Sequence, residues 1–413
     1  MARSLTNEEI MKIIEWRSTH HYEHYPLVLD GGWKCLVTDE ETKRTYLDMV
    51  ASYSAVIFGR SGPYYNRVKA VLINQLEKLA SATGSYPTEP YARFCQKITQ
   101  FCLMDRVIIK NSGAEAVEAA MKISKRFAYL TKGIPENSAE IISCSSNFHG
   151  RTQGVLSLSD NAMYRKNFGP FLPGCKVVPF GDIDALGGAI NKNTAAFMVE
   201  PIQGEGGINM PPENYLKQAE YLCRKNDVLF VFDEIQTGFG RTGTMFAHQA
   251  YGVEPDLMTV GKALSGGTGL PISAVLGRSC MMLVLEAGSE GSTFGGSPLA
   301  CAVGSEVIDI LNENPGFVER AREIGEYFLN ELKKIVSPTI KEVRGRGLLI
   351  GVELNSSLNA DSYRAMLLEE GILCGVAHEH TLRFSPPLII TKKEIDWVLP
   401  KIAKILQEMR LAQ

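Results

Sequence analysis

The 413-residue chain lacks several features that would place it in a distinctive class. Its nine cysteines are odd in number and no two have C-x-x-C spacing, which argues against a disulfide framework and indicates free thiols in a reducing compartment. Lysine and arginine total 43 against 46 acidic residues, so there is no basic surplus for binding nucleic acid. No apolar run approaches the roughly 20 residues of a membrane helix.

The sequence also lacks a recognisable set of metal ligands and a recognisable targeting signal. Histidines gather at residues 20–24 and 378–380, but no further cluster of cysteines or acids accompanies them, so we expect no metal site. The first residues lack the continuous apolar core of a signal peptide. We therefore expect a cytoplasmic protein, or one of the mitochondrial matrix if a targeting peptide was removed before Met1.

What is present is an alternation of strand and helix patterns over residues 54–303. This succession predicts an α/β domain with a mostly parallel sheet covered on both faces. Residues 1–53 form an N-terminal segment with a short helix and two strands. Residues 304–413 change to helical spacing with a few strands, including 372–376, and predict a small α+β domain.

Two strand ends carry groups of opposite charge. The apolar run 228–232 ends in Asp233, and the run 257–260 is followed by Gly261 and Lys262. If these strands are adjacent and parallel, the carboxylate and the amine face one crevice, since open α/β sheets place ligand groups at strand ends. The pair suits pyridoxal 5'-phosphate (PLP), because a lysine forms the Schiff base and a carboxylate keeps the pyridine nitrogen protonated.

Each of these residues also has a plainer interpretation. A lone lysine is more often a surface group, and a lone aspartate more often a helix cap. The stretch 238–243 fits the G-x-G-x-x-G pattern of a nicotinamide dinucleotide site, but it does not directly follow the strand and the sequence after it is a poor helix start.

Further strand ends carry groups that suit a cofactor and an anionic substrate. Asn111 to Ala116 lies where a strand turns into a helix, and its small residues leave N–H groups open for a phosphate, although an ordinary tight turn fits equally. Arg151 follows another strand and could bind a carboxylate or form a salt bridge. Glu200 and Glu205 end a third, and Arg383 stands alone in an apolar run, where it needs an anionic partner.

Taken together, these motifs resemble those of the class III (subgroup II) PLP-dependent aminotransferases, over nearly the whole chain. The matching stretches are NSGAEAVEAAMK, NFHGRT, VEPIQGEGG, VLFVFDEIQTGFGRTG, GKALSGG, GSTFGG and LRFSPPL. The resemblance implies the fold type I architecture, with a large PLP-binding domain and a small domain built from the N-terminal segment and the C-terminal part. It also implies a homodimer with active sites at the subunit interface, acting on small amino acids and 2-oxo acids.

The resemblance assigns the cofactor contacts residue by residue. Lys262 would carry PLP as a Schiff base and then move the proton of the substrate, while Asp233 pairs with the pyridinium nitrogen and Gln236 with the 3' oxygen. Phe148 and Ile235 would enclose the ring. The residues implied for the phosphate are Ser112, Gly113 and Ala114, with Ser292 and Thr293 from the neighbouring subunit.

Within the family the chain looks most like the ornithine-specific branch. Tyr22 and Arg151 match the residues that bind the α-carboxylate of ornithine, and Tyr53 matches a tyrosine specific to that branch. Glu205 would pair with Arg383 while the amino donor is bound. The pair would then open, so that Arg383 takes the α-carboxylate of 2-oxoglutarate and Arg151 its distal carboxylate.

The chain departs from the family pattern beside this pocket. Residues 57–63 replace the usual NQGHxHP, and residues 83–86 and 295–298 also differ. These changes keep open another ω-aminotransferase activity, on N-acetylornithine, lysine or 4-aminobutyrate. A PLP-binding protein without turnover is the alternative from a different class, but it gives no reason for a glutamate and arginine gate.

Overall fold

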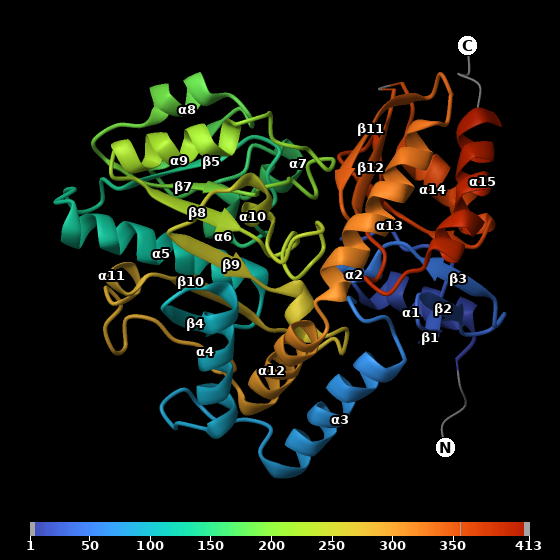
Figure 1. The fold of residues 1–413 in the computed structure, drawn as a ribbon, viewed down its shortest axis with the longest axis horizontal. Coiled ribbons are helices and arrows are strands. Elements are labelled where there is room, and N and C mark those ends of the chain that lie inside the picture. The colour runs from blue at the N-terminus through green and yellow to red at the C-terminus, as the bar shows by residue number, and fades with distance from the viewer. Residues whose placement is uncertain (1–4, 356, 409–413) are drawn as a thin grey trace.

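The structure is a computed structural model that describes residues 5–355 and 357–408. Two lobes are visible in Figure 1, one around a large sheet and the other around two smaller sheets near both chain ends. Over the described residues, no helix has the length and apolarity to cross a membrane. The same residues contain no group of three or more His, Cys, Asp or Glu side chains placed to hold a metal ion.

The large sheet has seven strands in the order β4-β10-β9-β8-β7-β5-β6. Its strands are β4 (Arg106–Lys110), β5 (Glu140–Cys144), β6 (Cys175–Val178), β7 (Thr194–Val199), β8 (Leu229–Asp233), β9 (Leu257–Val260) and β10 (Ser273–Gly277). All neighbours are parallel except β10, which runs antiparallel between β4 and β9. The mostly parallel α/β sheet predicted from the sequence is confirmed, and β10 is an addition that the sequence patterns did not reveal.

The strands of this sheet between the edge strands β4 and β6 are buried on both faces, and alternate residues point to opposite faces. Ile141, Met198 and Val231 belong to one apolar cluster, together with buried residues of helix α5 (Gly113–Thr131). Their neighbours Ile142 and Phe197 belong to a second cluster, with residues of helices α8 (Ile183–Ala189) and α9 (Tyr215–Lys225). This period of two explains the continuous apolar runs in the sequence, since a strand covered on both faces needs no polar side.

The other helices pack around this frame. They are α3 (Pro63–Lys78), α4 (Glu89–Cys102), α6 (Gln153–Leu156), α7 (Ala162–Arg165), α10 (Ala247–Tyr251), α11 (Ser279–Met282), α12 (Pro298–Glu313) and the 3₁₀ turn η1 (Lys262–Ser265). Helix α12 packs against α3 and α4 below the sheet (Figure 1). No long helix follows residues 238–243, which form turns before the five-residue α10, so the nicotinamide alternative lacks the helix it requires.

The second lobe joins the two ends of the chain. An N-terminal sheet has the order β1-β2-β3-β13, and a C-terminal sheet has the order β11-β12-β15-β14. Their strands are β1 (Leu29–Trp33), β2 (Leu36–Asp39), β3 (Thr45–Asp48), β11 (Ile340–Arg346), β12 (Leu349–Leu354), β13 (Ile372–Leu373), β14 (Gly375–Ala377) and β15 (Thr381–Phe384). The helices here are α1 (Asn7–Arg17), α13 (Gly316–Lys333), α14 (Ala360–Glu369) and α15 (Lys392–Glu408), and a short turn forms α2 (Ala51–Ser54).

One expected strand of this lobe is wrong in its detail. The run 372–376 divides into β13 and β14, which belong to different sheets. β13 pairs in parallel with β3, whereas β14 pairs antiparallel with β15. The chain must change direction between β13 and β14 to reach strands of two different sheets, and the spacing of apolar residues does not predict such a change.

The proposed domain boundaries after residues 53 and 303 stay predictions. Helix α12 runs through residue 303 without a break, so a helix end is the more natural place for the second boundary. A capping box at Thr391 and Glu394 begins α15: the Glu394 carboxylate accepts the Thr391 N–H at 2.7 Å, and Thr391 Oγ accepts the Glu394 N–H at 3.3 Å.

Candidate active site

The strand ends meet at one cavity of about 370 Å³. Its lining includes every residue predicted to contact the cofactor except Ser292 and Thr293: Ser112, Gly113, Ala114, Phe148, Asp233, Ile235, Gln236 and Lys262. β8 and β9 are neighbours in parallel register, with Asp233 opposite Thr259, and this pairing brings Asp233 and Lys262 into the lining of one cavity. The adjacency inferred from two separate strand ends is therefore confirmed.

Asp233 is held by three hydrogen bonds in a nearly closed environment. Its Oδ1 accepts the Ile235 N–H at 3.1 Å and the Thr259 hydroxyl at 3.2 Å, and its Oδ2 accepts Nδ1 of His149 at 2.7 Å. His149 is 3% exposed. Burial lowers the pKa of His149, but the hydrogen bond to Asp233 and its charge outweigh burial, so the net shift of that pKa is upward.

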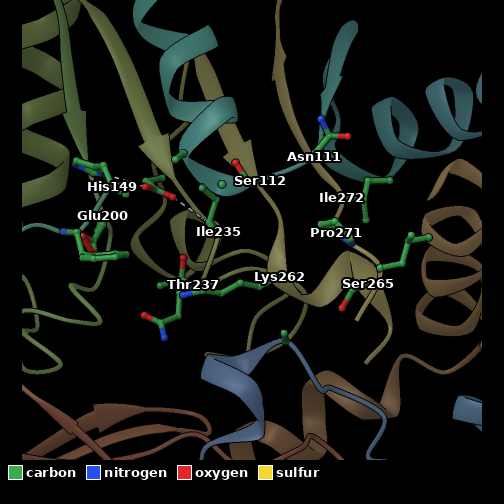
Figure 2. A pocket seen from close by; sticks show the side chains of 18 of the residues that line it. Asn111, Ser112, His149, Glu200, Ile235, Thr237, Lys262, Ser265, Pro271 and Ile272 are labelled. Atoms are coloured by element: carbon green, nitrogen blue, oxygen red, sulfur yellow. Dashed lines mark hydrogen bonds and ion pairs between the residues drawn. The ribbon is translucent and has the colours of Figure 1, made fainter. Parts of the chain in front are cut away.

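Glu200 lies beside His149, as Figure 2 shows. Its carboxylate accepts the Phe148 N–H at 2.7 Å and the Gly204 N–H at 3.0 Å, which holds two cofactor-cavity loops together. Burial raises the pKa of Glu200 to about 7, although the charge of His149 opposes the rise. The sequence singled out Glu200 as an acid at a strand end without assigning it a specific contact, and it did not single out His149, although both lie in stretches that match the family. Both residues follow strands of the sheet that carries Asp233, and this position after a strand was the signal that could have identified them.

Lys262 begins the 3₁₀ turn after β9 in a left-handed backbone conformation, with φ of 35°. No hydrogen bond or ion pair of its amine occurs within the part of the chain that the structure describes. Loss of hydration lowers the pKa of Lys262, while the charges of Glu205 and Asp233 oppose that decrease. A lowered pKa increases the neutral fraction of the amine, which is the nucleophilic form.

The N-terminus of α5 forms the other end of the cavity. Ser112 is the N-cap, and its hydroxyl accepts the Glu115 N–H at 3.2 Å, while the Glu115 carboxylate accepts the N–H groups of Asn111 and Ser112 at 2.7 and 3.1 Å. Among the described residues, none accepts the N–H groups of Gly113 and Ala114. Free N–H groups at the start of a 19-residue helix attract an anion.

The predicted substrate residues lie beyond the cofactor cavity. Tyr22 and Tyr53 line a second cavity of about 530 Å³ between α1, α14 and the turn α2. Arg151 is exposed, and its guanidinium carbon lies 4.1 Å from the ring centroid of Tyr164 and 5.7 Å from that of Phe148. Of the residues predicted to bind substrate, only Tyr22 and Tyr53 line a cavity, whereas Arg151, Glu205 and Arg383 are not in the lining of either. Ser52 and Tyr53 of α2 border the second cavity, and the following Ala55 borders the first.

Arg383 and Glu205 form an ion pair between Tyr53, which lines the second cavity, and Lys262, whose charge acts on Glu205. Arg383 lies on β15 and is fully buried, and its Nη1 donates to Glu205. Its Nε and Nη2 have no acceptor in the described structure. The Tyr53 ring covers this guanidinium, with 5.1 Å between the Arg383 carbon and the ring centroid. Burial raises the pKa of Glu205, but the charges of Arg383 and Lys262 outweigh it, so the net shift is downward and the carboxylate is ionised.

Ser292 and Thr293 do not line the cofactor cavity of their own chain. They lie on the loop between α11 and α12, where Ser292 Oγ accepts Nδ2 of Asn111 at 2.9 Å. The neighbouring Phe294 is 61% exposed. Their assignment to the active site of a partner subunit therefore stays a prediction.

Comparison with known proteins identifies the family. The family model of the class-III aminotransferases matches residues 18–406. An ornithine aminotransferase of Brevibacillus brevis is 47% identical over 387 residues, which cover 94% of this chain and 95% of that protein. The crystal structure of the ornithine aminotransferase from Toxoplasma gondii has a TM-score of 0.94 at 39% identity, covering 98% of this chain and 96% of that one. An acetylornithine aminotransferase of Elizabethkingia anophelis has a TM-score of 0.86 at 36% identity, covering 98% and 100%.

The chain therefore belongs to the class III aminotransferases, enzymes that depend on PLP. The family, the fold type I architecture and the cofactor predicted from the motifs are confirmed. Membership in a family of transaminases favours an enzyme over the alternative of a PLP-binding protein without turnover.

The residues present fit the cofactor. Nε2 of Gln236 is buried without a partner in the described structure, which leaves a donor for a cofactor oxygen. A Cβ on Gly113 would lie 3.0 Å from Ile235, and a Cβ on Gly150 would lie 2.7 Å from Ala114, so the glycines keep the phosphate end of the cavity open. An acid, an unpaired lysine and free N–H groups therefore match the pyridine nitrogen, the carbonyl and the phosphate of PLP.

Proposed function

We propose that the protein transfers the δ-amino group of L-ornithine to 2-oxoglutarate, giving glutamate 5-semialdehyde and glutamate. The semialdehyde then cyclises to pyrroline-5-carboxylate. The observation that carries this proposal is the ion pair between the buried Arg383 and Glu205 under the Tyr53 ring, with Glu205 close enough to Lys262 for their charges to interact. The ornithine aminotransferase relatives support the same donor.

The residues at the sheet edge would serve the chemistry common to the family. When bound, PLP supplies an electrophilic carbonyl for the amino group and a ring that withdraws electrons from the reacting carbon. Lys262 would hold the cofactor covalently and, once released, move a proton at the δ-carbon of the donor with its Nζ. Asp233 would keep a proton on the ring nitrogen, and its three hydrogen bonds fix the carboxylate for that contact.

The donor would be oriented from its far end. Arg151, with Tyr22, would bind the α-carboxylate, so that the δ-amine points toward Lys262. Tyr53 would contact the α-amine. Because Glu205 neutralises Arg383, the α-carboxylate is not drawn toward that arginine, and the wrong amino group stays away from the cofactor.

The acceptor would bind to both arginines, with its α-carboxylate on Arg383 instead of Arg151. When Glu205 releases Arg383, the buried guanidinium would bind the α-carboxylate of 2-oxoglutarate and Arg151 its distal carboxylate. An arginine without a partner in a dry site costs several kcal/mol. This cost keeps Glu205 in place until a dicarboxylate replaces it.

We further propose a homodimer in which Ser292 and Thr293 of one subunit complete the phosphate site of the other. The exposed Phe294 and the free N–H groups of the phosphate site support this arrangement. A cytoplasmic location is proposed as well, supported by nine cysteines that are all unpaired thiols.

A single-turnover half-reaction tests the donor. The PLP-loaded protein is mixed separately with L-ornithine, N-acetylornithine, lysine and 4-aminobutyrate while its absorption spectrum is followed. We expect ornithine to convert the cofactor fastest to its pyridoxamine form and to yield pyrroline-5-carboxylate. Faster conversion by another amine would identify that amine as the donor in place of ornithine and would leave the family assignment unchanged.

Replacing Tyr53 with isoleucine is expected to reduce the preference for ornithine over N-acetylornithine by about tenfold, or about 1.4 kcal/mol. The reason is that Tyr53 is the residue proposed to contact the free α-amine, which the acetylated donor lacks. The measurement is the ratio of kcat/KM values in the half-reaction. Tyr221→Ile, which changes a tyrosine 64% exposed on α9, is the control. An unchanged ratio would remove Tyr53 from donor selection.

Replacing Glu205 with alanine is expected to lower the rate with ornithine by about tenfold while the half-reaction with glutamate is kept or accelerated. Arg383 would then be free to attract the α-carboxylate and present the wrong amine. Both half-reactions are followed by stopped-flow absorption. Glu353→Ala removes a carboxylate that pairs with Arg344 and Lys341 away from both cavities, and serves as the control. Equal rates before and after the Glu205 change would contradict the gate.

A further inference from the structure

Residues 57–63, which depart from the family pattern, divide into two parts in the structure. Ile57 and Phe58 are buried in the core, at 0% and 1% exposure. Arg60 leaves the core and lines the second cavity together with Tyr22 and Tyr53. We infer that Arg60 and Asp48 are positioning residues that hold Tyr53 over Arg383, and thereby set the preference for donors with a free α-amine. The inference rests on the proposed role of Tyr53 in donor selection.

The backbone that carries Tyr53 needs support. Four successive residues of α2, Ala51, Ser52, Tyr53 and Ser54, have φ angles of 49°, 49°, 56° and 77°. None of them is glycine or asparagine, the residues that most easily adopt this left-handed region. A run of such residues persists only where its surroundings fix it. The orientation of Tyr53 therefore depends on the contacts that hold this turn.

Asp48 supplies those contacts from the end of β3. It is 3% exposed, and its Oδ1 accepts the N–H groups of Val50 at 3.0 Å and Ala51 at 2.8 Å. Its Oδ2 accepts Nη2 of Arg60 at 2.7 Å. One carboxylate therefore joins the start of the turn to Arg60. Removal of Asp48 takes away the contacts to the turn, and removal of Arg60 takes away the partner that orients them.

The surrounding structure leaves room for Arg60 and fixes its backbone. A Cβ on Gly32 of β1 would overlap the Arg60 side chain, so only glycine fits at that position. The Arg60 N–H donates to the carbonyl of Lys34 at 2.9 Å. On the far side of the turn, the Ser385 hydroxyl donates to the Val50 carbonyl at 3.0 Å. Since Ser385 directly follows β15, the strand of Arg383, the same contacts fix the turn relative to that arginine.

The effect on selectivity follows from this geometry. The Tyr53 ring covers the Arg383 guanidinium at 5.1 Å and borders the cavity proposed for the α-amine of the donor. If the turn relaxes, the ring no longer has a fixed place against the donor. The loss applies to a donor with an α-amine, whereas a donor without one never used the contact.

The test compares L-ornithine with 5-aminopentanoate, which is ornithine without its α-amine. The PLP-loaded wild-type protein and the variants Arg60→Gln, Asp48→Asn, Tyr53→Ile and Arg60→Gln/Tyr53→Ile are assayed by half-reaction kinetics, with Tm recorded for each. We expect Arg60→Gln to lower the ornithine to 5-aminopentanoate ratio of kcat/KM by about tenfold. In the Tyr53→Ile background it should lower that ratio no further, because both changes act through one side chain.

Arg67→Gln is the matched control, because Arg67 forms an ion pair of equal length, 2.7 Å, with Glu306 between α3 and α12. Arg60→Lys, which keeps the charge, should retain most of the selectivity even if Arg60→Gln proves too unstable to assay. A wild-type ratio in Arg60→Gln or Asp48→Asn, or an additive effect in the double variant, would overturn the inference. Absence of ornithine turnover in the wild-type protein would instead overturn the proposed function.

Discussion

A Lys262→Ala variant is expected to lose turnover by at least about 10⁴-fold, because it loses both the covalent anchor of the cofactor and the amine that moves the proton. The structure supports this double role: the amine borders the cavity, has no partner within the described residues and has a lowered pKa. The measurement is the rate of the ornithine half-reaction with PLP added in excess. The absorption band of the cofactor–lysine linkage should also be absent.

Lys132→Ala provides the comparison for that experiment. Lys132 is a partly buried lysine that donates to the Thr194 carbonyl at 2.9 Å and lies outside both cavities. Its loss should change stability without changing the cofactor spectrum. Activity of Lys262→Ala close to that of the wild-type protein would exclude Lys262 from the mechanism.

Replacing Asp233 with asparagine is expected to reduce the half-reaction rate by about 10² to 10³-fold, the usual effect of removing one charge aimed at a reacting group. The amide keeps the shape of the side chain but not the charge that holds a proton on the ring nitrogen. His149 should respond too: its raised pKa depends on the hydrogen bond and charge of Asp233, so that pKa should fall in the variant. Stopped-flow absorption gives the rate, and NMR titration of the imidazole gives the pKa.

Asp256→Asn controls for the loss of a partly buried carboxylate beside the same sheet. Asp256 accepts the Phe230 N–H at 2.8 Å just before β9, at the end opposite the cavity. It should affect stability and leave the rate per folded enzyme unchanged. A small effect of Asp233→Asn on the rate, with the cofactor still bound, would mean that another group protonates the ring.

Much of the cofactor site was predictable because its residues lie at strand ends. Apolar runs located β8 and β9, and adjacent parallel strands bring their carboxyl ends together, so the sequence predicted the pairing of Asp233 with Lys262 on the condition that the strands are neighbours, which the structure shows. β10 was not predicted because its residues, SAVLG, form a short strand after a turn-rich stretch. Its antiparallel position between β4 and β9 is determined by contacts with these two strands and not by the local sequence pattern.

The substrate side was less accessible to sequence reasoning. No local pattern predicts that Ala51 to Ser54 adopt a left-handed turn, since these residues favour other conformations and only tertiary contacts enforce this one. The pairing of Arg60 with Asp48 has the same origin, because Asp48 ends β3 and Arg60 lies twelve positions later in the loop before α3. The sequence showed that residues 57–63 depart from the family pattern, but it did not show what these residues contact.

The division of residues 372–376 between two sheets has a mechanical consequence. β13 is hydrogen-bonded to the N-terminal β3, and two residues later β14 is hydrogen-bonded to β15. Such a short link gives the sheets no freedom to separate, so Tyr53, which follows β3, and Arg383 on β15 travel together. If this lobe shifts against the seven-stranded sheet during the catalytic cycle, the distance between the Tyr53 ring and the Arg383 guanidinium stays the same. Only the distance from these two side chains to Lys262 changes, so the lobe can move without altering which donor fits between them.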